Sequence, residues 1–267
     1  MSVATSSDGT RIGYQVQGSG PPLLLVDGAF CSRAFGPMPA LAPLLSSRFS
    51  VVTFDRRGRG ESGDTAPYAV ERELEDLTAV AAAVGGPLFV YGTSSGAVLA
   101  ARAVDSGLPA AKLVLHEPPL ALDGTHAPAP ADFRERIAEH LKAGRRSEAV
   151  KVFMRVVGVP GIGIFFMRLM PGVWPKLRAV AHTLPYDFAI LGDTQSGGPM
   201  PAELGAVLSS LRLPTLLLVG GKSPPWMHHA AQRLADQIAG ATLRVLPGQT
   251  HNVSAKAVAP ALIEHFT

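Results

Sequence analysis

The sequence predicts an α/β fold with a mostly parallel sheet, and three observations support this. Short apolar runs alternate with helical patterns along much of the chain, which is typical of strands joined by crossover helices. The runs are almost continuously apolar, as strands covered by helices on both faces must be. Of the 267 residues, 47% are apolar and 17% charged, a globular composition for which one hydrophobic core suffices.

The expected elements begin with a hairpin. Residues 2 to 18 alternate around the turn Ser7-Asp8-Gly9-Thr10, which predicts two antiparallel strands. Six buried strands are predicted at residues 23–26, 51–54, 88–91, 112–115, 215–219 and 242–246. Amphipathic helices are predicted at residues 68–84, 96–106, 225–239 and 255–266.

Residues from about 118 to 210 break this alternation. The interval is rich in Pro at first, then helical with Met and Phe, and no clear strand appears in it. A helical cap over the open end of the sheet is the simplest interpretation, and ordinary helical core is the alternative. We therefore expect one domain over residues 1–267, with residues 1–117 and 211–267 as its core and about 118–210 as its cap.

Composition also bears on partners and location. The formal charge is +3, and the short clusters Arg56-Arg57-Gly58-Arg59 and Arg145-Arg146 do not alternate with aromatic residues, so we interpret them as solvated arginines and expect no nucleic-acid partner. The single cysteine, Cys31, excludes an intramolecular disulfide. No signal peptide or apolar stretch of about 20 residues is visible, which favours a cytoplasmic protein with no membrane partner. The oligomeric state stays open, with a homodimer among the alternatives.

Gly92-Thr93-Ser94-Ser95-Gly96 matches the pattern G-x-S-x-G, which is weak by itself. Its context strengthens it, because a buried strand leads in and a helix of small residues leads out. A strand that turns sharply into a helix exposes one side chain in a strained position, and the flanking glycines let the two elements approach. The pattern predicts Ser94 as a nucleophile, and the N–H of Ser95 as a donor to a developing oxyanion.

With this motif the chain resembles the α/β-hydrolase family over almost its full length. Three further segments carry the resemblance: Asp55 to Ser62 is similar to D-x-R-G-x-G-x-S, Leu23 to Gly28 to the strand and oxyanion turn, and Pro247 to His251 to the terminal His loop. The resemblance implies an eight-stranded, mostly parallel sheet with helices on both faces, a helical cap after the sixth strand, and the order Ser, acid, His.

His251 follows the last predicted strand in a glycine-containing loop, and an imidazole there can accept and return the serine proton. The second oxyanion donor is expected from the loop after residues 23–26, where this chain has Asp27-Gly28 in place of the family's frequent His-Gly. We assign the N–H of Ala29, with that of Phe30 as the alternative. Asp27 is interpreted as a structural turn residue.

The family's usual position for the acid, the loop after the seventh strand, contains no carboxylate in this chain. Ser223 stands about where an Asp is expected. The enzyme could then be a dyad or inactive, or the acid could come from elsewhere. Glu117, directly after the sixth strand, is the preferred candidate because it keeps the order Ser94, Glu117, His251. Asp193 is a poor second.

The residues predict hydrolysis of a small apolar carboxylic ester or lactone through an acyl-enzyme, with no metal or organic cofactor. Phe30, Cys31, Trp226 and Met227 fall in loops expected to line the pocket for this small-molecule substrate. Other acyl or C–C bond chemistry on the same triad is the rival within enzymes. A non-catalytic small-molecule receptor on the same scaffold is the rival from another class.

Overall fold

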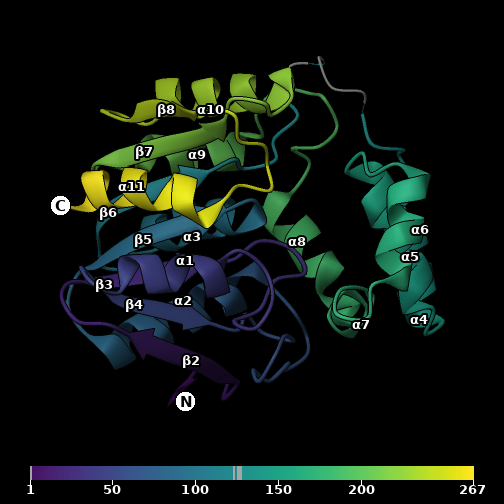
Figure 1. The fold of residues 1–267 in the computed structure, drawn as a ribbon, viewed down its shortest axis with the longest axis horizontal. Coiled ribbons are helices and arrows are strands. Elements are labelled where there is room, and N and C mark those ends of the chain that lie inside the picture. The colour runs from purple at the N-terminus through teal and green to yellow at the C-terminus, as the bar shows by residue number, and fades with distance from the viewer. Residues whose placement is uncertain (1, 123, 125–127) are drawn as a thin grey trace.

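The computed structural model describes residues 2–122, 124 and 128–267, and Figure 1 shows its single sheet. The strands are β1 (Ser2–Thr5), β2 (Arg11–Gln17), β3 (Pro22–Val26), β4 (Ser50–Phe54), β5 (Leu88–Thr93), β6 (Ala110–His116), β7 (Thr215–Gly220) and β8 (Thr242–Leu246). Their order across the 8-stranded sheet is β1-β2-β4-β3-β5-β6-β7-β8. β2 is antiparallel to both of its neighbours, and all other pairs are parallel. The predicted fold class is confirmed.

The pleat of the central strand shows why the strand sequences are so apolar. In β3, Leu24 and Val26 belong to the core cluster on one face of the sheet, and Leu23 and Leu25 belong to the cluster on the other. All four side chains are at most 1% exposed. Successive residues in a strand point to opposite faces, so a strand covered on both faces must be apolar at every position.

Helices cover both faces of the sheet (Figure 1). α1 (Met38–Leu45) and α11 (Ala255–Phe266) pack on one face, and α2 (Val70–Val84), α3 (Ser95–Asp105), α9 (Ala202–Ser210) and α10 (Pro225–Gln237) contribute to the core on the other. The four predicted helices are α2, α3, α10 and α11. α1 was not predicted from the sequence, because its helical pattern is interrupted by Pro43.

The interval of about 118–210 is helical wherever the structure assigns it regular secondary structure, and its residues 123 and 125–127 lie outside the described part of the chain. Its elements before α9 are α4 (Phe133–Lys142), α5 (Arg146–Val156), α6 (Gly161–Leu169), α7 (Trp174–Ala179), the 3-10 helix η1 (Ala181–Thr183) and α8 (Leu184–Leu191). We call these elements, residues 133–191, the helical insertion. α4 to α7 lie to one side of the sheet, with α8 between them and the core (Figure 1).

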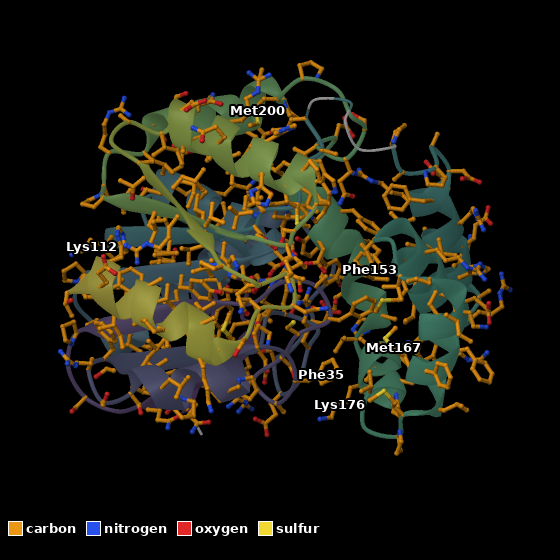
Figure 2. All side chains as sticks on the ribbon, turned by 45° about the horizontal axis from the view of Figure 1, so that its top comes forward. Phe35, Lys112, Phe153, Met167, Lys176 and Met200 are labelled. Carbon is orange, nitrogen blue, oxygen red and sulfur yellow. The ribbon has the colours of Figure 1, made fainter. Side chains whose placement is uncertain are left out.

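The helical insertion has its own apolar cluster, which it shares with the loop after β3. Phe133, Ile137 and Trp174 are buried in this cluster together with Phe30 of that loop. Figure 2 shows Phe35 of the same loop facing Lys176 of α7, whose Nζ lies 5.3 Å from the centre of the Phe35 ring. The insertion therefore packs against the edge of the sheet where β3 ends. Among the described helices, none combines the length and the apolar character that crossing a membrane requires.

Candidate active site

Ser94 occupies a strained turn between β5 and α3. Its backbone has φ 55° and ψ −131°, a conformation that a residue with a side chain rarely adopts. A Cβ added to Gly92 would lie 2.5 Å from the carbonyl oxygen of Gly96, and one added to Gly96 would lie 2.4 Å from that of Val26. Both positions therefore require glycine, as the G-x-S-x-G pattern predicts. The turn places the Ser94 side chain at the carboxyl edge of the sheet.

Glu117 lies at the same edge, one strand further along. The Ser94 N–H donates to the carbonyl of His116, the last residue of β6, at 2.9 Å. The Glu117 N–H in turn donates to the carbonyl of Leu218 in β7 at 3.0 Å. Glu117 also has a positive φ of 45°, so its backbone leaves the direction of the strand. The ends of β5, β6 and β7 thus bring the predicted nucleophile and the predicted acid to adjacent positions.

The Glu117 carboxylate contacts His251 directly. Its Oε2 lies 2.7 Å from His251 Nδ1, while its Oε1 accepts the Gly220 N–H at 2.7 Å and the Ser223 hydroxyl. The Glu117 side chain is 1% exposed, and that of His251 is 37% exposed. Burial pushes the pKa of Glu117 upward, but the hydrogen bonds from His251, Ser223 and Gly220 outweigh it and hold the pKa below its usual value.

Ser223 stands in the loop where an Asp was expected, and it donates to the carboxylate that comes from β6. The loop is tied to the His251 segment by hydrogen bonds from the Gly221 N–H to the Leu246 carbonyl and from the Lys222 N–H to the Gln249 carbonyl. These contacts fix the position of the His251 loop relative to Glu117.

The loop after β3 approaches Ser94 from the other side. A Cβ added to Gly28 would lie 2.8 Å from Ser94 Cβ and 3.3 Å from Ser94 Oγ, so only glycine allows this contact. The next residues are Ala29 and Phe30, and Phe30 has a positive φ of 62°. Among the described residues, the Ala29 N–H donates no hydrogen bond to a backbone carbonyl of a turn or loop. The Ser95 N–H opens α3, where helix N–H groups have no intrahelical acceptor.

The positive φ values of residues other than glycine are concentrated in this region. In the described part of the chain they occur at Phe30, Ser94 and Glu117, which lie in the predicted oxyanion loop, at the predicted nucleophile and at the predicted acid. Such backbone strain costs on the order of 1–3 kcal/mol per residue and is most common at functional sites. This observation is independent of the side-chain contacts and indicates the same site.

Two buried ionisable groups border the site. Burial raises the pKa of Asp27 to about 8, although the Arg59 and Arg56 guanidiniums act in the opposite direction. At neutral pH Asp27 is therefore mostly uncharged and does not oppose an oxyanion. Burial lowers the pKa of His116 to about 4, and its Nδ1 lies 2.7 Å from the Tyr91 hydroxyl. His116 is therefore neutral under the same conditions.

The interpretation of the first arginine cluster as solvated is wrong. Arg56, Arg57 and Arg59 are at most 2% exposed, and each is paired with a carboxylate. Arg57 pairs with Asp76 of α2 at 2.7 Å. The short spacing of charges resembles a surface pattern, and only the fold brings Glu73, Asp76 and Asp187 into contact with these arginines.

Asp187 of α8 joins the other two arginines. Its Oδ1 lies 2.7 Å from Arg56 Nη1 and its Oδ2 lies 2.7 Å from Arg59 Nη2. The Ser95 hydroxyl also donates to Asp187 Oδ1, at 2.7 Å. Arg56 is paired in addition with Glu73. Asp187 was not predicted as part of the site, because nothing in the sequence of its helical segment distinguishes this carboxylate from a solvated one.

The remaining predicted residues lie in different surroundings. Phe30 is in the apolar cluster of the insertion, and burial raises the pKa of the Cys31 thiol. Trp226 and Met227 pack instead in a small cluster with Val219 and Ala231. The second candidate for the acid, Asp193, is 92% exposed and pairs with Arg134 at 3.7 Å. The structure therefore gathers Ser94, Glu117, His251, Ala29 and Ser95 around the sheet edge, and leaves Asp193 on the surface.

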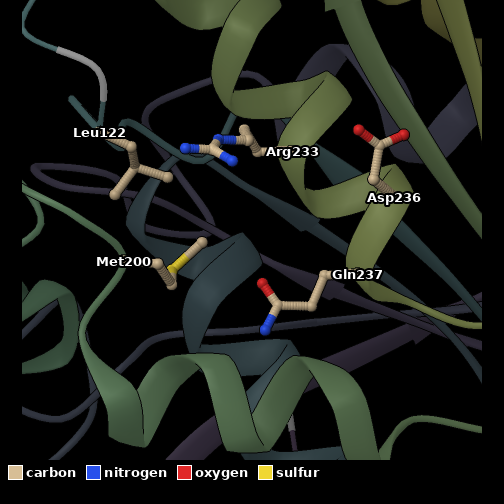
Figure 3. A pocket seen from close by; sticks show the side chains of 5 residues that line it. All are labelled: Leu122, Met200, Arg233, Asp236 and Gln237. Atoms are coloured by element: carbon tan, nitrogen blue, oxygen red, sulfur yellow. The ribbon is translucent and has the colours of Figure 1, made fainter.

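A pocket of about 240 Å³ lies elsewhere, beside α10 (Figure 3). Its lining residues are Leu122, Met200, Arg233, Asp236 and Gln237. Ser94, Glu117 and His251 do not line it, so it has no part in the site described above. Among the described residues, no group of three or more His, Cys, Asp and Glu side chains is placed to hold a metal ion.

A family model described as "Alpha/beta hydrolase family" matches residues 20–261. The crystal structure of an alpha/beta hydrolase from Sphaerobacter thermophilus DSM 20745 is 48% identical, covers 100% of both chains and superimposes with a TM-score of 0.91.

Two curated relatives are also similar in sequence. The uncharacterized hydrolase YraK of Bacillus subtilis (strain 168) is 32% identical over 152 residues, which is 55% of this chain and 55% of that relative. The putative carbamate hydrolase RutD of Variovorax paradoxus (strain S110) is 28% identical over 92% of this chain and 91% of its own.

Proposed function

Because the chain belongs to the alpha/beta hydrolase family, we propose that it is a serine hydrolase that cleaves small apolar carboxylic esters or lactones through an acyl-enzyme intermediate. The observation that carries the proposal is the 2.7 Å contact between Glu117 Oε2 and His251 Nδ1, beside a serine held in a nucleophile turn. The acid that the loop after β7 lacks is supplied from the end of β6.

The proposed reaction uses these residues in sequence. Glu117 accepts a hydrogen bond from the Nδ1–H of His251, which holds the tautomer whose Nε2 is unprotonated and able to act as a general base. Ser94 Oγ attacks the acyl carbon while His251 takes its proton, and the N–H groups of Ala29 and Ser95 stabilise the oxyanion. His251 then protonates the departing alkoxide. Water then attacks the acyl-enzyme while His251 acts as the general base. The carboxylic acid product leaves, and Ser94 is free again.

The surroundings of the oxyanion loop support an apolar acyl group. Phe30 contacts Phe153 of α5 edge to face with ring centres 5.1 Å apart, and Phe153 stacks on Phe188 of α8 at 6.2 Å. Figure 2 shows Phe153 on the side of the insertion that faces the core. Apolar walls with a few directed polar groups are typical of small-molecule sites.

The test is hydrolysis of p-nitrophenyl acetate and butyrate by wild type, Ser94→Ala, His251→Ala and Glu117→Gln, each first shown to be folded by circular dichroism. We expect kcat to fall by about 10³-fold or more for Ser94→Ala and His251→Ala, and by a large factor for Glu117→Gln. Full activity of Glu117→Gln would refute its role as the acid. An inactive wild type that also resists labelling by a fluorophosphonate would favour a non-catalytic receptor.

Carbamate hydrolysis is a second candidate, favoured by the similarity to RutD over 92% of this chain. The same triad would form a carbamoyl-enzyme in place of an acyl-enzyme. Repeated turnover of a p-nitrophenyl N-alkylcarbamate at a rate close to that of the butyrate ester would support it. A single burst of p-nitrophenol followed by lasting inactivation would mean that the carbamoyl-enzyme forms but is not hydrolysed. That result would support ester hydrolysis alone.

A further inference from the structure

One buried carboxylate of the insertion reaches both sides of the proposed oxyanion hole. Asp187 of α8 is 1% exposed, and its Oδ1 accepts the hydroxyl hydrogen of Ser95 at 2.7 Å. Ser95 carries one of the two proposed oxyanion donors. A carboxylate oxygen in a dry environment forms a strong and directional hydrogen bond, so this contact restrains the first residue of α3.

The second side is reached through the guanidiniums. Asp187 Oδ2 pairs with Arg59 Nη2 at 2.7 Å, and Arg59 Nη1 donates to the Gly28 carbonyl at 2.6 Å. Arg56 Nη1 pairs with Asp187 Oδ1 at 2.7 Å and donates to the Asp27 carbonyl at 3.3 Å. Asp27 and Gly28 directly precede Ala29, the proposed second donor.

We propose that Asp187 is a positioning residue that sets the oxyanion hole, orienting the Ser95 N–H directly and the Ala29 N–H through Arg59 and Arg56. The inference rests on the proposed function. If Asp187 served only to balance charge, its contacts with the two arginines would be enough. Here the network also includes the neutral Ser95 hydroxyl and the Gly28 carbonyl, which directly precedes Ala29. Since Asp187 belongs to the insertion, the oxyanion hole is complete only when α8 is seated on the core.

The test compares Ser95→Ala, Asp187→Asn and the double variant. Ser95→Ala removes the hydroxyl and keeps the N–H, so it is the variant least harmful to folding. We expect kcat for p-nitrophenyl butyrate to fall about 10- to 100-fold with KM changed less than about threefold, because the oxyanion forms only in the transition state. Affinity for phenylboronic acid, whose tetrahedral adduct places an oxygen in the oxyanion hole, should fall by a similar factor.

Non-additivity supplies a second readout. If Ser95 and Asp187 act through the same hydrogen bond, the loss of kcat in the double variant should be smaller than the product of the two single losses. Tyr186→Phe is the matched control, since Tyr186 is also on α8 and donates to Asp64 at 3.0 Å without touching Ser95. Its kcat and boronate affinity should equal those of wild type.

Two results would overturn the inference. One is a Ser95→Ala variant with wild-type kcat and boronate affinity, and the other is a Tyr186→Phe variant that loses as much as Ser95→Ala. Either result, with a wild type whose activity depends on Ser94, leaves the hydrolase proposal intact. A wild type that is inactive and unlabelled by a fluorophosphonate overturns both.

Discussion

The two oxygens of the Glu117 carboxylate have separate roles. Oε1 is held by the Gly220 N–H and the Ser223 hydroxyl, which leaves Oε2 for His251. A carboxylate fixed in this way cannot rotate, so it also fixes the plane of the imidazole. Under the proposed function, Ser223 has a supporting role, because it donates to the Glu117 carboxylate that is proposed as the acid.

Replacement of this serine measures the size of that supporting role. Ser223→Ala leaves Glu117 Oε1 with the Gly220 N–H, so we expect kcat to fall by less than about tenfold, far less than in Glu117→Gln. Steady-state hydrolysis of p-nitrophenyl butyrate by the two variants checks this. Equal losses in both variants would contradict the assignment of Glu117 as the acid.

Asp27 gives a prediction for stability. Its pKa is raised to about 8 by burial, so between about pH 4 and pH 8 the folded protein holds a proton that the unfolded chain has lost. The free energy of unfolding of wild type should therefore fall as pH rises through this window, by at most about 1.4 kcal/mol per pH unit. Asp27→Asn has no titratable group at this position. The difference in free energy of unfolding between this variant and wild type should therefore shift in favour of the variant as pH rises. Urea denaturation at pH 5, 6.5 and 8 tests this, and parallel pH profiles would contradict it.

At the scale of single residues, the sequence supports a prediction of function where the chemistry is encoded locally. Ser94 is marked by its own flanking glycines, and His251 by its position after the last strand. Glu117 was predicted because it follows the sixth strand and keeps the family's order of Ser, acid and His, and the sheet order places the end of β6 between β5 and β7. Asp187 could not be found, because its role depends on how α8 packs against residues more than 90 positions earlier in the chain.

At the scale of elements, the junction of β5 and α3 depends on how closely two backbones approach. A Cβ at residue 96 would lie 2.4 Å from the Val26 carbonyl oxygen and 2.5 Å from that of Asp27, and neither backbone group can yield easily. Gly96→Ala should therefore destabilise the protein by several kcal/mol and displace the oxyanion loop. Thermal unfolding measures the loss of stability, and hydrolysis of p-nitrophenyl butyrate measures the effect on activity.

A glycine in open space is the control for this substitution. A Cβ on Gly161, the first residue of α6, meets no atom within 4 Å. Gly161→Ala should leave stability unchanged or raise it by up to about 1 kcal/mol, because alanine favours a helix. Similar losses in both variants would show that steric contact at residue 96 is not the cause.

The helices of the interval of about 118–210 show where periodicity stops being informative. Its helical character was predicted, but α9 joins the core beneath the sheet, where Leu204 and Leu208 are buried, whereas α5 packs in the separate cluster. Both are apolar on one face, and a pattern of apolar residues does not specify which surface that face will meet. The division into core and cap therefore stays a prediction.

At the scale of the whole molecule, α8 connects two apolar clusters that are otherwise separate. Ile190 and Leu191 are buried with the sheet core, and Leu184 and Phe188 with the insertion. The polar connection beside them consists of Asp187 with Arg56 and Arg59, charges that are costly to bury unless they are paired. The mutual attachment of core and insertion therefore depends on α8 more than on α4 to α7.

Hydrogen exchange can measure this arrangement directly. Since α4 to α7 pack mainly within their own cluster, we expect their amides to exchange together through an opening of lower free energy than that of β5 to β7. α8, held by buried ion pairs, should be protected like the core. Asp187→Asn should lower the protection of α8 to that of α4 to α7 while β5 to β7 keep theirs, and Tyr186→Phe should leave the protection of α8 unchanged.

Equal opening free energies for α4 to α7 and β5 to β7 in wild type would mean that core and insertion unfold as one unit. In that case the proposed oxyanion donors could not be disconnected from α8 without unfolding the protein.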